Sequence, residues 1–99
     1  MKHALYGVKK VAVAQVGQAV SSVLSVELEQ RESDYLGIYL SGMAGSTKVR
    51  IVGRPDPEGE PFEREFPEWD VLIYLDGPDV FPSLGGLELE GGVIRALRG

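Results

Sequence analysis

The segment that most constrains the fold is residues 70–97, because it begins with the wholly apolar stretch Val71–Leu75. In a strand, the odd-numbered residues of this stretch face one side of a sheet and Leu72 and Tyr74 face the other. A strand that is apolar on both faces is either central in the core or covered by a partner on its second side. We expect the odd-numbered residues to face the core and Leu72 and Tyr74 to contact a neighbour.

Turn signals divide the rest of this segment. Asp76-Gly77-Pro78 ends the apolar strand, and Phe81-Pro82 makes a second corner. Gly91-Gly92 is a two-residue hairpin signal, and Val93–Leu97 follows it as a final strand. Short strands separated by turns are typical of small antiparallel β domains.

Further stretches with β patterns recur at intervals of about 8–12 residues, as in β-sandwiches and small barrels. We expect strands at Val8–Val16, Val20–Glu29, Tyr35–Leu40, Thr47–Val52 and Phe62–Phe66. Polar, glycine-rich or proline-rich connections are expected at Gln30–Asp34, Ser41–Ser46 and Arg54–Pro61. A helix over residues 11–28 is disfavoured because of its β-branched content and Gly17. The prediction is an all-β fold, a small antiparallel β-sandwich or barrel of about seven to eight short strands, with an extended N-terminal arm.

The 99 residues are enough for one domain. We expect residues 1–17 to form an N-terminal arm or first strand and residues 18–99 to form the β-sandwich domain. The N-terminus lacks the long apolar core and small-residue cleavage site of a signal peptide, so none is expected. The chain has no cysteine and no asparagine, and this pattern favours a thermophilic source.

Charge is distributed unevenly along the chain, whose net charge is −5. Residues 55–90 contain eleven acidic side chains against Arg64 alone, whereas residues 1–26 contain three lysines and no acid. An acidic protein repels phosphate backbones, so we expect no nucleic-acid partner. The basic N-terminus is either an arm that docks on an acidic neighbour or a solvated tail.

The side chains that usually carry out catalysis are scarce. His3 is the only histidine, and a general base needs a positioned partner that the nearby sequence does not supply. Asp76, Asp79 and Glu88 do not have the spacing of a calcium loop, and aspartates in turns normally bond to backbone. The sequence therefore predicts no catalytic residue, no cofactor-binding residue, no metal ligand and no cofactor.

The aromatic residues have two interpretations. Trp69, together with Tyr35, Tyr39 and Tyr74, is able to line a sugar-binding face, but aromatic residues in small β domains more often belong to the core or a subunit interface. We favour the second interpretation. The candidate interface residues are Lys2, Lys9, Lys10, Leu72, Tyr74 and Trp69.

As a whole, residues 19–92 resemble a family of small β-sandwich structural proteins of tailed bacteriophages. Members open with a short Ser/Ala-rich strand, continue with a segment like LGIYLP and a small-residue loop, and close with a pattern like LDPxxFPGLxxLKL. The matching pieces here are Ala19–Ser22, Leu36–Leu40, Ser41–Ser46, Val49–Val52, Ile73–Leu84 and Leu87–Leu89.

This resemblance implies a non-enzymatic component of a virion, most closely a capsid decoration (cement) protein or a head–tail accessory subunit. Its partners would be other virion proteins, such as major capsid or head and tail subunits, together with copies of itself, and neither nucleic acid nor a membrane. It would be made in the host cytoplasm and reside in the virion. The alternative is a carbohydrate- or ligand-binding β module.

Overall fold

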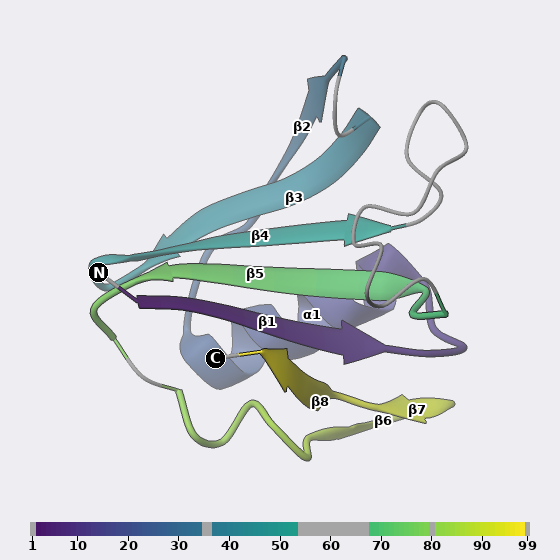
Figure 1. Cartoon of the computed structure of the whole chain (residues 1–99). Helices are drawn as coiled ribbons and strands as arrows, with labels where there is room; N and C mark the ends of the chain where they lie inside the picture. Colours follow the sequence, from purple (N-terminus) through teal and green to yellow (C-terminus); the bar gives the residue numbers. More distant parts are fainter. Residues whose placement is uncertain (1, 35–36, 54–67, 80, 99) are drawn as a thin grey trace.

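The computed structural model describes residues 2–34, 37–53, 68–79 and 81–98. Its main element is a six-stranded antiparallel sheet with the strand order β2-β3-β4-β5-β1-β8, and a second, two-stranded sheet pairs β6 with β7 (Figure 1). The elements are β1 Lys2–Val8, α1 Val13–Leu24, β2 Glu29–Ser33, β3 Gly37–Ala44, β4 Thr47–Gly53, β5 Val71–Gly77, β6 Glu88–Leu89, β7 Gly92–Val93 and β8 Arg95–Arg98.

The predicted antiparallel β architecture is confirmed, with eight strands in the described ranges. The doubly apolar strand is β5, and it lies inside the sheet between β4 and β1. The odd-numbered residues from Val71 to Leu75 are buried in the main core, as expected. That core lies between the sheet and α1, which Figure 1 shows behind the strands.

The N-terminal residues form an interior strand and not an arm. β1 pairs with β5 along its whole length and with β8 on its other side. Of the two alternatives for residues 1–17, the first strand is therefore the one found, but the predicted span Val8–Val16 is wrong. β1 ends at Val8, and a helix begins at Val13.

The helix α1 replaces the first half of the strand that was predicted at Val20–Glu29. Val13, Val16, Val20 and Leu24 recur every three or four residues, and Val16 and Val20 are completely buried against the sheet. The β-branched residues cost a few tenths of a kcal/mol each in a helix. Burying a valine contributes about 1.5–3 kcal/mol, so the packing decides the conformation.

Gly17 has a packing reason to be in the helix. A Cβ at Gly17 would overlap Leu40 Cδ1, so the missing side chain lets α1 lie close to β3. The helix ends at Ser25, whose φ of 52° and ψ of 47° are left-handed. Ser21 Oγ then donates to the carbonyl of Val26 at 2.6 Å and fixes the exit of the chain.

Two predicted connections are strands in the structure. The turn predicted at Gln30–Asp34 is largely β2, and the loop predicted at Ser41–Ser46 continues β3 as far as Ala44. The reversal is confined to Gly45 and Ser46, with a φ of 65° at Gly45. Strand β4 matches its prediction to within one residue.

Some predictions fall outside the described residues. These are Tyr35 and Leu36 of the third predicted strand, the whole of the Arg54–Pro61 loop and the strand predicted at Phe62–Phe66. At the other end, the glycine hairpin is found as β6 and β7. The predicted final strand is divided between β7 and β8, with Ile94 fully buried between them. No described helix has the length and apolar character needed to cross a bilayer.

Candidate functional site

The side of the six-stranded sheet opposite α1 is the candidate site, and we call it the open face. It is the near side of the sheet in Figure 1, and no described helix lies over it. Because side chains alternate along a strand, Leu72 points away from the main core. It forms a second apolar cluster with Leu5 and Val52.

One row of paired residues crosses the open face from edge to edge. The register aligns Arg31, Tyr39, Val52, Leu72, Gly7 and Arg95 on the six successive strands. We call this the central row. Adjacent strands lie about 4.8 Å apart, so the central row is about 24 Å long. It has an arginine on each edge strand and apolar residues or glycine between them.

The middle of the open face has a buried floor and a partly exposed upper layer. Leu5, Val52 and Leu72 are at most 2% exposed. Partly buried side chains of Tyr39, Trp69, Tyr74 and Leu97 pack against them. The Leu72 side chain is 2% exposed in the single chain, so its predicted contact with a neighbour stays a prediction.

Gly7 creates the recess in which the Trp69 indole lies. A Cβ at Gly7 would be 2.8 Å from Cδ2 and 2.9 Å from Cε3 of Trp69, and 2.7 Å from Cδ1 of Leu97. Asp70 anchors the adjoining chain, since its N–H donates to the carbonyl of Val8 at 3.1 Å. Its Oδ2 also accepts from the backbone N–H of Lys10 at 2.6 Å. The indole of Trp69 therefore lies directly against Gly7 of β1.

Cations lie over two of the aromatic rings. Lys9 Nζ is 4.7 Å from the centroid of the Trp69 ring, and Arg50 Cζ is 5.5 Å from that of Tyr74. Both distances are within cation–π range. One side of each ring is thus in contact with a positive charge.

Asp76 joins His3 and Arg50 in a charged network at one end of the open face. His3 Nδ1 donates to Asp76 Oδ1 at 2.5 Å, and Arg50 Nη2 donates to Asp76 Oδ2 at 3.1 Å. Burial acts to raise the pKa of Asp76, but the hydrogen bonds from His3 and Arg50 outweigh it and hold the pKa below its ordinary value. Sequence reasoning missed this network because His3 and Asp76 are distant in the chain.

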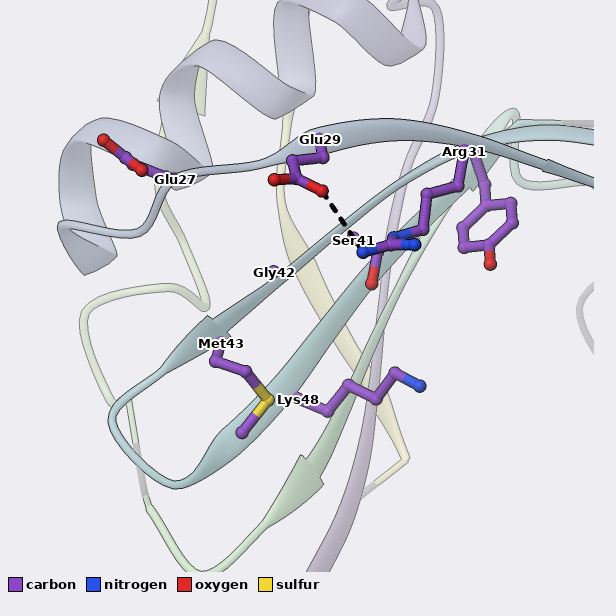
Figure 2. Close-up of a pocket in the computed structure, with 8 residues that line it drawn as sticks. Glu27, Glu29, Arg31, Ser41, Gly42, Met43 and Lys48 are labelled. Atoms are coloured by element: carbon purple, nitrogen blue, oxygen red, sulfur yellow. Dashed lines mark hydrogen bonds and ion pairs between the residues drawn. The ribbon is translucent and has the colours of Figure 1, made fainter.

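A hollow of about 530 Å³ opens on the β2 side of the open face. Figure 2 shows Glu27 and Glu29 on one side of it and Arg31 and Lys48 on the other. The Arg31 guanidinium bonds to Glu29 at 3.2 Å, with both side chains more than half exposed. The residues that line the hollow are Glu27, Glu29, Arg31, Tyr39, Ser41, Gly42, Met43 and Lys48.

Asp79, which was also considered as a metal ligand, has a structural role. Its Oδ2 accepts from the backbone N–H of Ser46 at 2.9 Å and from Thr47 Oγ1 at 3.0 Å. Its own N–H donates to Thr47 Oγ1 at 2.9 Å. Asp79 thus bonds to a turn, although that turn belongs to another part of the chain. Among the described residues, no group of three or more potential ligands is placed to hold a metal ion.

Most of the predicted interface residues meet on or beside the open face. Trp69, Tyr74 and Lys9 lie on it, and Lys10 bonds to Asp70 at its margin. Lys2 belongs to β1, and its side chain is outside the described part. The sequence did not identify Gly7, Arg31, Arg50 or Arg95 as residues of this face.

Comparisons with protein-family models, with curated proteins and with solved structures found no match.

Proposed function

We propose that this chain is a non-enzymatic protein that works by packing its open face against a partner protein. The observation that supports the proposal is the composition of that face. A buried apolar floor lies beneath partly exposed Tyr39, Trp69 and Tyr74, with charged side chains around them. An aromatic centre with a charged rim is the usual anatomy of a protein–protein interface.

The charged network supports a binding role better than a catalytic one. The recorded hydrogen bonds of Asp76 go to His3 and Arg50, and Arg50 in turn lies against the Tyr74 ring. These contacts fix side chains on the surface of the open face. The resemblance to virion proteins extends the proposal: the partner would be a capsid, head or tail subunit, and the protein would reside in the virion.

The alternative, a carbohydrate-binding module, requires an aromatic ring with one side available for stacking. The ammonium group of Lys9 lies over Trp69, and the guanidinium of Arg50 lies over Tyr74. A sugar would have to displace both cations before it could stack. Packing against a protein needs no such displacement, because the cations can remain as part of the rim.

The proposal can be tested by replacing one residue at a time with a photo-crosslinking amino acid in the natural host. Tyr39 and Tyr74 are the positions on the open face, and Ser22, exposed on α1, is the matched control. We expect Tyr39 and Tyr74 to capture the same protein in stoichiometric yield and Ser22 not to capture it. Equal capture from Ser22, or no adduct from the open face, would show that the proposal is wrong.

A further inference from the structure

We infer that the partner surface of the open face is an extended protein segment with an apolar middle and carboxylates at its two ends. This rests on the proposed function and specifies the chemistry of the partner. The carboxylates would meet Arg31 and Arg95, and the apolar middle would lie between them, beside the Trp69 side chain. The central row supplies the geometry for these contacts.

The charge distribution favours an acidic partner. Five of the ten lysine and arginine residues lie on the open face, although the chain as a whole has a net charge of −5. These are Lys9, Arg31, Lys48, Arg50 and Arg95. Four acidic residues lie on the same side: Glu29, Asp70 and Asp76 are already bonded to groups of the protein itself, and Glu27 lines the hollow beside β2. Among the described residues, the open face therefore has a small excess of positive charge, although the chain as a whole is acidic.

The two ends of the central row are the points where carboxylates would bind. Arg95 is exposed on β8 and Arg31 is exposed on β2, about 24 Å away across the sheet. The Arg31–Glu29 pair is exposed on both sides, and such pairs contribute little to stability. Arg31 can therefore exchange Glu29 for a carboxylate of a partner at small cost.

A second copy of this chain fits the same face poorly. A two-fold contact through the central row would place cationic ends against cationic ends, since both ends are arginine. A nucleic acid fits poorly as well, because a chain with a net charge of −5 repels a long phosphate backbone. An acidic protein segment avoids both conflicts.

Trp69 makes the inference measurable, because it is the only tryptophan in the chain. The probe is a peptide of about eight residues, since an extended chain of that length spans the central row at about 3.3 Å per residue. It has apolar residues in the middle and glutamates at both ends. Matched peptides have glutamines or lysines at the ends, and a single-stranded oligothymidylate is the nucleic-acid probe.

We expect the glutamate-ended peptide to change the Trp69 emission and to bind about 2- to 30-fold more tightly than the glutamine-ended one. This range corresponds to two exposed ion pairs. The preference should diminish as salt is raised from about 50 mM to about 500 mM. Replacing both arginines, Arg31→Gln with Arg95→Gln, should abolish the preference and leave binding of the glutamine-ended peptide unchanged.

The control variant is Gln30→Glu, which changes the net charge by the same amount as Arg31→Gln and lies next to it on β2. Gln30 faces the opposite side of the sheet, so we expect the preference to survive. If all three peptides bind equally and change the Trp69 emission, the inference of an acidic partner is wrong. The proposed function would still stand. Tighter binding of the lysine-ended peptide or of the oligothymidylate, or no response to the glutamate-ended peptide at about 1 mM, would also overturn it.

Discussion

Replacing Gly7 with alanine should loosen the open face without unfolding the protein. The added Cβ would lie 2.8 and 2.9 Å from two ring atoms of Trp69 and 2.7 Å from Leu97 Cδ1. Carbon atoms pack at about 3.5–4.0 Å, so each contact is too short by nearly 1 Å. Leu97 can turn aside because its terminal methyl group is at a partly exposed site. The indole is rigid and must move outward from the floor formed by Leu5 and Leu72.

The loss of unfolding free energy depends on how far the indole can move away from the added methyl group. Inserting a methyl group into a well-packed site costs about 1–3 kcal/mol. Trp69 is only partly buried and can move toward solvent, so we expect the lower part of that range, about 1–2 kcal/mol. For a domain of this size, that corresponds to a fall in melting temperature of about 4–16 °C.

The assay is intrinsic fluorescence, since one tryptophan reports the whole signal. Gly7→Ala should shift the Trp69 emission to the red and raise its quenching by acrylamide, together with the lower melting temperature. Gly85→Ala is the matched control, because its Cβ would meet Tyr6 Cε2 at an ordinary 3.6 Å. An unchanged emission and melting temperature in Gly7→Ala would refute the placement of the indole over β1.

Three further predictions test other parts of the structure. Gly42→Ala should destabilise the protein by about 2–3 kcal/mol in urea unfolding, because its Cβ would overlap the backbone carbonyl oxygen of Glu27, which cannot turn aside. Asp79→Ala should cost about 1–3 kcal/mol by leaving Thr47 and the Ser46 N–H without their acceptor, whereas Asp79→Asn keeps an acceptor oxygen and should cost less. The pKa of Asp76 is lowered by folding, so its contribution to stability is complete above about pH 5 and is lost as the pH falls through the folded-state pKa. The difference in unfolding free energy between the natural protein and Asp76→Asn should therefore shrink between about pH 5 and pH 2, and a difference that grew on acidification would contradict the assigned hydrogen bonds.

The sequence predicted the sheet better than the helix, for a physical reason. In β5, the local sequence and the tertiary packing agree. Every residue from Val71 to Leu75 is apolar, and the strand lies inside the sheet. In residues 13–24, local propensity and packing disagree. Four valines and Gly17 disfavour a helix locally, but the three- and four-residue spacing of Val13, Val16 and Val20 suits a helix on a sheet. Burial of Val16 and Val20 against the sheet outweighs the local propensity, so the helix forms.

The open face was predicted in part. The doubly apolar β5 indicated that something lies over Leu72, and Trp69 and Tyr74 were named as interface candidates. What covers Leu72 could not be predicted, because it depends on pairing between distant segments. Gly7 is opposite Leu72 by register, and nothing in the local sequence around either residue predicts that register. The His3–Asp76 contact was missed for the same reason.

The same long-range pairing links the open face to the stability of the whole domain. β1 comes from the start of the chain, β5 from beyond residue 70 and β8 from the end, yet they are neighbours and together they hold Trp69. The indole site therefore exists only when all three strands are in place. A partner that binds this site binds only the folded state and raises its stability by RT ln(1 + [L]/Kd), about 2.7 kcal/mol at a hundredfold excess over Kd. Some amides exchange only when the whole domain unfolds. For these amides, binding at the open face should slow hydrogen exchange in β4 as strongly as in β1.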